Sequence, residues 1–281
     1  EFQKLMTKNH PRAGGIPKPE DLDKVNLDKS IQIYKERFAN AGDFTFFFVG
    51  SFNEDSIKPL IEKYIGSLPS IPKKETFKDL GIRPPVGMVK KEINKGSDPK
   101  SMVAMVFNTP AAYSAKEALS LSSLAEVMNI KLIEQLREEK GGVYGISAYT
   151  SFSRIPVSAA SFTITFPCAP DNVDTLSKAV IDELQKIIKD GVTPEDLEKI
   201  KEKKKRKLEV DSKQNSFWMN NIYDAFFYGT NPKEILEKQK MSAALTSRMI
   251  QDAAKKYINL NSYIIATLKP DKQADKPLKG F

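Results

Sequence analysis

The segment LREEKGGVYGISA (136–148) joins two different hydrophobic patterns and decides how the chain can fold. Ahead of it, apolar residues recur every three or four positions over 116–137, which predicts a long amphipathic helix. After it, VYGISAYTSF (143–152) has the composition of a β-strand. Gly141 and Gly142 can end the helix and turn the chain. The sequence therefore predicts a helix, a turn and a strand in direct succession.

The next strand pattern, SFTITF (161–166), alternates apolar and polar residues. Phe162, Ile164 and Phe166 share one face of such a strand, and the hydroxyl side chains between them share the other. This alternation is typical of an antiparallel sheet with one buried face. We expect this strand to pair antiparallel with residues 143–152.

Similar patterns extend in both directions along the chain. Further strands are predicted at 44–50, 88–93, 102–109 and 262–268, the last of which we expect to return to the first sheet. Helices are predicted at 28–39, 194–228, 232–239 and 246–258. One more helix is predicted to begin after Asn53, its N-cap, and another to end at Gly191. The fold class is therefore α+β, with antiparallel sheets packed against helices, rather than a doubly wound parallel sheet.

The chain ends differ in composition from its middle. Residues 1–27 are rich in Pro, Gly and charge and are predicted to form a linker from a preceding domain, while 28–270 form one domain and 271–281 a tail. The chain does not begin with Met or with a signal-peptide pattern, so we expect a fragment or a processed product. No apolar run is long enough for a membrane span.

Metal-ligating residues are scarce. The 281 residues include one histidine, His10, and one cysteine, Cys168, which are too few soft ligands for a catalytic zinc site of the usual kind. His10 is predicted to be a surface residue, and Cys168 a small buried or edge thiol. We therefore predict no metal site and no bound cofactor in this chain.

From the residues alone, Arg137 is a surface cation near a helix C-terminus and Tyr144 an ordinary strand aromatic. However, the pattern LRE-x-x-G-G-x-Y-G around them resembles the Arg/Tyr signature in the C-terminal half of pitrilysin/insulinase-type zinc peptidases. The runs at 33–69 and 213–236 are also similar to segments of that family. The resemblance covers most of residues 28–268 in the family's order.

The resemblance implies a LuxS/mitochondrial-processing-peptidase-like metallohydrolase domain, in a hydrolase whose two halves close around a peptide. The family's first half carries His-x-x-Glu-His and a distal Glu that bind zinc and supply a general base. This chain cannot contain that motif, because it has one histidine. We therefore expect the zinc of the full enzyme to be bound by an N-terminal half, in an upstream segment or a separate subunit, and this chain alone to be inactive.

The resemblance assigns the family's substrate-backbone contacts to Arg137 and Tyr144. It implies that this non-catalytic C-terminal part of a zinc metalloendopeptidase closes the peptide chamber and supports proteolysis. An inactive scaffold or assembly subunit of the same fold, as in respiratory core proteins, is the alternative. A periplasmic or cell-envelope bacterial setting is an expectation from the resemblance only.

Two other features invite functional interpretations. The run KIKEKKKRKLE (199–209) could bind nucleic acid, but its five consecutive basic residues surround the helix without interleaved aromatics, so a solvated helix or a basic chamber wall is favoured. The net charge of +8 is weak evidence for a nucleic-acid partner, because 36 acidic residues are interspersed with the 44 basic ones. Trp218 and the aromatic cluster at 226–228 are predicted to be core residues, with exposed substrate contacts as the alternative.

Overall fold

The computed structural model describes residues 1–134 and 145–271 and divides into two compact units. The sheet unit comprises Glu1–Ala13, Asp79–Arg206 and the chain from Lys238 onward. The helical unit comprises Gly14–Lys78 and Lys207–Glu237.

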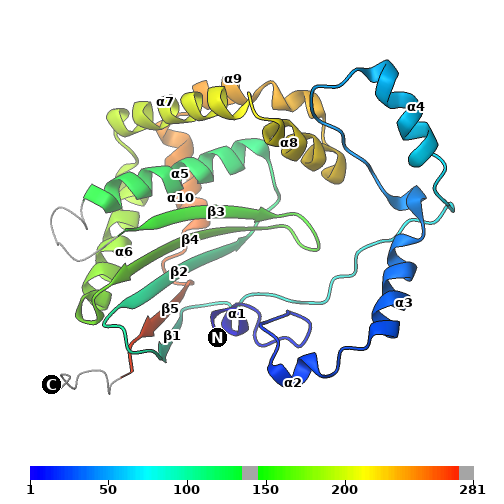
Figure 1. The fold of residues 1–281 in the computed structure, drawn as a ribbon. Helices are drawn as coiled ribbons and strands as arrows, with labels where there is room; N and C mark the ends of the chain where they lie inside the picture. The colour runs from blue at the N-terminus through cyan, green and yellow to red at the C-terminus, as the bar shows by residue number, and fades with distance from the viewer. Residues whose placement is uncertain (135–144, 272–281) are drawn as a thin grey trace, which may run out of the picture. The chain divides into compact units, whose positions relative to one another are not determined.

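The sheet unit is built on a five-stranded sheet with the order β1-β5-β2-β4-β3 (Figure 1). The strands are β1 (Val89–Asn94), β2 (Ser101–Pro110), β3 (Ser147–Ser153), β4 (Ala159–Cys168) and β5 (Ile264–Lys269). β5 pairs parallel with β1 and antiparallel with β2, and β3 and β4 pair antiparallel as predicted. The sheet is therefore mixed, and β3 is an edge strand.

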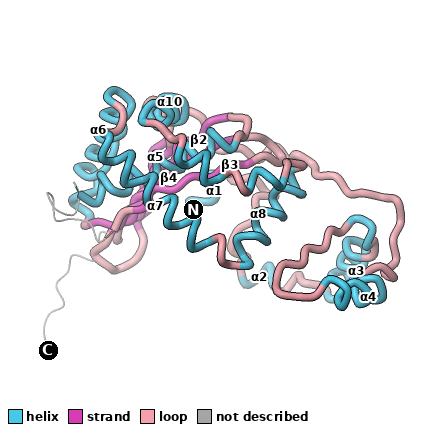
Figure 2. Tube along the Cα trace, turned by 90° about the horizontal axis from the view of Figure 1, so that it is seen from above, coloured by secondary structure: helices cyan, strands magenta, loops and turns pink. Residues whose placement is uncertain are grey.

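Helices α5 (Ala115–Ile133), α6 (Val173–Asp190) and α10 (Ser247–Tyr257) cover one face of the sheet (Figures 1 and 2). The core between them combines alternate strand residues, including Phe162, Ile164 and Phe166, with the apolar faces of the helices. The α+β architecture predicted from the sequence is confirmed. The smaller elements of this unit are α1 (Phe2–Met6), a 3₁₀ turn at Pro170–Asn172 and α9 (Lys238–Ala243).

Local signals place the helix ends of the sheet unit. Ser114 caps α5 by accepting a hydrogen bond from the Glu117 amide, 3.1 Å away. Gly191 follows α6 with a φ of 80°, a conformation that glycine adopts without a Cβ clash. Thr193 Oγ1 then accepts from the Asp196 amide and begins α7 (Pro194–Asp211), which runs from the sheet unit into the helical unit. These two boundaries agree with the predicted helix stop and start.

The helical unit contains short helices and extended connections. Its elements are α2 (Pro19–Leu22), α3 (Leu27–Phe38), a 3₁₀ turn at Ala41–Asp43, α4 (Glu54–Tyr64), the end of α7, α8 (Asn215–Tyr228) and a 3₁₀ turn at Pro232–Ile235. Asn53 caps α4 as predicted, because its Oδ1 accepts from the Ser56 amide. Trp218 Nε1 donates to the Ser212 carbonyl at 2.9 Å, across the turn between α7 and α8.

The strand predicted at 44–50 does not form, and this prediction was wrong. The five strands of the described residues pair with one another in the sheet unit, so Phe44–Gly50 has no strand to pair with. An extended segment without a partner forms no ladder, whatever its propensity. The helices predicted at 194–228 and 232–239 are each divided into two elements as well.

The aromatic cluster of α8 also differs from the prediction. Phe226 and Phe227 are 62% and 53% exposed rather than core residues, and the Phe226 ring contacts Phe47 edge to face at 5.7 Å. A small helical unit has too little interior to bury every aromatic side chain that its sequence carries. In the part of the chain that the structure describes, no helix is long and apolar enough to span a bilayer.

Candidate functional site

Arg137 and Tyr144, the substrate contacts predicted by resemblance, lie outside the described residues. The structure does describe the elements that flank them, since α5 ends at Ile133 and β3 begins at Ser147. The candidate site is therefore characterised by the contacts that hold α5 and β3 in place.

Asn129 on α5 joins that helix directly to the start of β3. Its Nδ2 donates to the Ala148 carbonyl at 2.9 Å, and its Oδ1 accepts from the Ala148 amide at 2.7 Å. An edge strand otherwise leaves such backbone groups unpaired. The two bonds fix the position of β3 relative to α5, on either side of the segment that carries Arg137 and Tyr144.

A buried carboxylate holds the C-terminal part of α5 in place. Asp196 Oδ2 accepts a 2.6 Å hydrogen bond from Thr193 Oγ1 and lies 2.9 Å from Lys131 Nζ. Burial raises the pKa of Asp196, but the Thr193 hydrogen bond and Lys131 outweigh this effect and hold the pKa below its ordinary value. The carboxylate thus stays ionised and links α5 to the start of α7.

The N-terminal part of α5 is joined to α10 through another charged group. The Tyr257 hydroxyl donates to Glu117 Oε2, and Lys256 Nζ lies 3.1 Å from the same oxygen. The Tyr257 hydrogen bond and the Lys256 charge lower the pKa of the Glu117 carboxyl, despite the opposing effect of partial burial. α5 is therefore anchored to α10 at one end and to α7 near the other.

The basic run of α7 is largely neutralised by carboxylates. Lys204 Nζ lies 2.8 Å from Glu126 Oε1 on α5, and Arg206 and Lys207 pair with Glu202 and Asp211 at 2.7 and 2.9 Å. A nucleic-acid site requires basic side chains that are available to phosphates. This pairing favours the solvated-helix interpretation of the run.

The sheet face opposite the helices carries a set of hydroxyl groups on β3 and β4. Ser147, Tyr149 and Ser151 lie opposite Thr165, Thr163 and Ser161 in the strand register. The Tyr149 side chain is 52% exposed. Neither Tyr149 nor Asn129 was predicted as a site residue; the signal available for Asn129 was a polar amide directly after the buried Met128 of α5.

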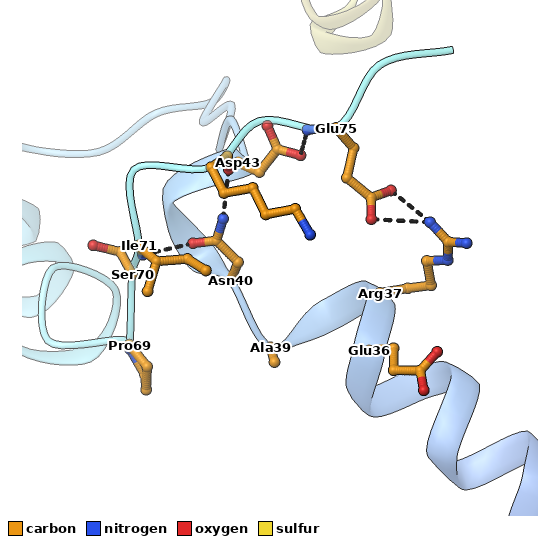
Figure 3. Close-up of a pocket in the computed structure, with 10 residues that line it drawn as sticks. Glu36, Arg37, Ala39, Asn40, Asp43, Pro69, Ser70, Ile71 and Glu75 are labelled. Carbon is orange, nitrogen blue, oxygen red and sulfur yellow. Dashed lines mark hydrogen bonds and ion pairs between the residues drawn. The ribbon is translucent and has the colours of Figure 1, made fainter. Parts of the chain in front are cut away.

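A hollow of about 380 Å³ lies in the helical unit, between the end of α3 and residues 69–75 (Figure 3). Several of its polar side chains bind one another or the local backbone. Arg37 pairs with Glu75 at 2.9 Å, while Asn40 donates to the Lys73 carbonyl and accepts from the Ile71 amide. These bonds fix the path of the chain after α4.

The single histidine and the single cysteine each have a structural environment that does not require a metal ion. His10 is partly exposed, and its Nδ1 accepts from the Arg12 amide at 3.1 Å. Cys168 is fully buried at the end of β4, as predicted, and burial raises the pKa of its thiol. Within residues 1–134 and 145–271, no group of three or more His, Cys, Asp or Glu side chains could hold a metal ion.

Known proteins with similar sequences are zinc proteases. The probable zinc protease PqqL of Escherichia coli is 22% identical over 244 residues, which are 82% of this chain but 25% of the relative. The crystal structure of the periplasmic protease PqqL from Escherichia coli has a TM-score of 0.80 and 17% identity, covering 96% of this chain and 30% of that one. This chain thus spans about a quarter of its relative's length.

A peptidase M16 inactive domain from Pseudomonas fluorescens has a similar structure, with a TM-score of 0.73 and 17% identity over 99% of this chain and 65% of that one. The sequence profile of the family described as "Peptidase M16 inactive domain" matches residues 24–204, well over half of the chain. The chain therefore belongs to the inactive-domain family of the M16 peptidases.

Proposed function

We propose that this chain is the non-catalytic C-terminal part of a zinc metalloendopeptidase. In this proposal it closes the peptide chamber and contributes Arg137 and Tyr144 as contacts to the substrate backbone. A separate N-terminal half, in the same polypeptide or another subunit, binds zinc and performs hydrolysis. The observation that carries the proposal is the pair of hydrogen bonds between Asn129 and Ala148, which we call the Asn129 clamp. In this member of a peptidase family, the clamp fixes the elements that precede and follow Arg137 and Tyr144 in the sequence.

The chemistry of the two side chains suits this role. A guanidinium and a phenol both donate hydrogen bonds to peptide carbonyl oxygens. A donor directed at the oxygen that becomes negative during peptide hydrolysis stabilises the transition state more than the ground state. Loss of one such donor typically costs about 2.7–4 kcal/mol, or roughly 100- to 1,000-fold in kcat.

The anchoring of α5 supports the same proposal. Contacts at the substrate must be held to within about half an ångström to be effective, which requires rigid supporting elements. The ion pair between Lys131 and Asp196 and the hydrogen bond between Tyr257 and Glu117 tie α5 to two further helices. A periplasmic location, like that of the periplasmic protease PqqL from E. coli, is part of the proposal.

The test is a peptidase assay with a quenched peptide, after this chain is combined with a His-x-x-Glu-His-containing half. We expect cleavage to need both parts and to fall about 100-fold or more in Arg137→Ala. Tyr144→Phe should also lose kcat if its hydroxyl stabilises the oxyanion. Arg248→Ala, an exposed arginine on α10, and Tyr64→Phe are matched controls that should retain activity.

Two outcomes would contradict the proposal. Turnover within about twofold of wild type in Tyr144→Phe would exclude the oxyanion role. Assembly of the two parts with no cleavage of any peptide would favour the alternative, an inactive scaffold subunit of the same fold.

A further inference from the structure

Two segments of this chain, 31–50 and 250–269, have the same layout although they lie in different units. In each, an α-helix ends two residues before an asparagine, Asn40 after α3 and Asn259 after α10. An extended apolar run then begins five residues beyond the asparagine. In the second segment this run is β5, and in the first it is residues 45–50.

The turn at the asparagine is the same in both segments. Asn40 Oδ1 accepts from the Gly42 amide at 3.2 Å, and Asn259 Oδ1 accepts from the Asn261 amide at 2.9 Å. The carbonyl of each asparagine accepts from the amide three residues later, at 3.3 Å after Asn40 and 3.0 Å after Asn259. The two helices are thus connected to their extended runs by matching Asx turns.

Three pairs of residues at equivalent positions are chemically alike. Ile31, Phe38 and Phe44 correspond to the C-terminal residues Ile250, Tyr257 and Tyr263. The C-terminal residues pack in the sheet unit, where Tyr257 is 1% exposed and the Tyr263 ring stacks on Phe107 at 5.0 Å. Their N-terminal counterparts are among the exposed hydrophobic residues of the chain.

The exposed residues form one continuous aromatic surface, which we call the α3 aromatic surface. It comprises Tyr34, Phe38, Phe44 and Phe46, each in ring contact with the next at 4.8, 5.7 and 6.2 Å. In the extended run, Phe44, Phe46 and Phe48 are exposed, whereas Phe47 between them packs on α8. This alternation is that of a strand with one free face and no neighbours.

We infer that residues 26–50 are the closing helix and strand of another domain of this same fold. Residues 45–49 take the place of β5 in that domain's sheet, parallel to the counterpart of its β1 and antiparallel to that of its β2. The α3 aromatic surface then packs where α10 packs here, on counterparts of α5 and α6. The partner is a domain of this fold that lacks its own final helix and strand.

Two observations favour this partner over an unrelated one. β5 lies between β1 and β2, so an equivalent strand needs two open strand edges, which an intact globular sheet does not offer. The relatives that match this chain are about three and a half times its length, which leaves room for further domains. The inference does not depend on the proposed substrate contacts, because α3 and residues 45–49 include neither of them.

The test co-expresses this chain with the region encoded directly upstream and follows backbone amide hydrogen exchange. In the chain alone, we expect amides 45–49 to exchange much faster than those of 264–268. In the complex, both sets should exchange at comparable slow rates. Protection of 45–49 in the chain alone, through a second copy, would overturn the inference, as would a complex in which they remain unprotected.

A second measurement uses substitutions at exposed positions, which leave the chain's own fold intact by circular dichroism. Phe46→Asp places a charge where the inference puts a buried aromatic side chain, so affinity for the upstream region should fall by at least about 30-fold. Leu236→Asp, another exposed apolar residue of the helical unit, is the matched control and should change affinity less than twofold. Equal effects would overturn the inference. A normal complex in which Arg137→Ala leaves peptide cleavage unchanged would instead refute only the substrate-contact proposal.

Discussion

Replacement of Asn129 by leucine tests the clamp between α5 and β3. The substitution keeps the side-chain volume but removes the donor to the Ala148 carbonyl and the acceptor for its amide. Ala148 is 5% exposed, so water cannot fully replace the lost partners. An orphaned buried polar group costs about 1–3 kcal/mol, and we expect a total loss of about 2–4 kcal/mol.

Thermal unfolding followed by circular dichroism measures this effect. At roughly 2–4 °C per kcal/mol for a domain of this size, Asn129→Leu should lower the midpoint by about 10 °C. Asn129→Asp keeps the acceptor but loses the donor and should fall between wild type and Asn129→Leu. Glu134→Ala, an exposed change next to the end of α5, is the control. A midpoint for Asn129→Leu within about 2 °C of wild type would refute the argument that these bonds secure β3.

Three further predictions concern the sheet unit. Because the folded-state pKa of Glu117 is lowered, its contribution to stability is present above the ordinary value of 4.5 and is lost as pH falls through the folded pKa. Urea titrations should therefore show a smaller decline in unfolding free energy on acidification in Glu117→Gln than in wild type. Cys168, buried and with a raised pKa, should react with a thiol reagent only under unfolding conditions, and rapid reaction of the native protein would contradict its burial. Gly191→Ala forces a Cβ into a positive-φ backbone conformation and should cost about 1 kcal/mol in urea unfolding, whereas an unchanged midpoint would argue against that conformation.

Local sequence patterns predicted most of the sheet unit. The alternation in 161–166 indicated the buried face of β4, and Gly191 with Thr193 located the boundary between α6 and α7. The parallel pairing of β5 with β1 was not predictable, because it joins residues about 175 positions apart with no local signal. The strand prediction for residues 44–50 was wrong for a related reason. Strand propensity is a local property, but a strand forms only when another strand pairs with it.

The candidate site was only partly accessible to sequence reasoning. The resemblance identified Arg137 and Tyr144, and their role stays a prediction because the structure does not describe them. Asn129 was missed because its importance depends on Ala148, a residue 19 positions away whose backbone groups lie at a sheet edge. A pattern of residue types reports which face of a helix is buried, but not which backbone group a polar side chain will meet.

Trp218, whose indole N–H donates to the Ser212 carbonyl, is an intrinsic fluorescence probe of the helical unit. Trp218 is the only tryptophan in the sequence, so the intrinsic fluorescence excited at 295 nm originates from the helical unit alone. Circular dichroism, in contrast, averages over both units. Comparison of the two signals during denaturation therefore distinguishes unfolding of the α7–α8 turn from unfolding of the sheet. It shows whether the two units unfold in one cooperative transition.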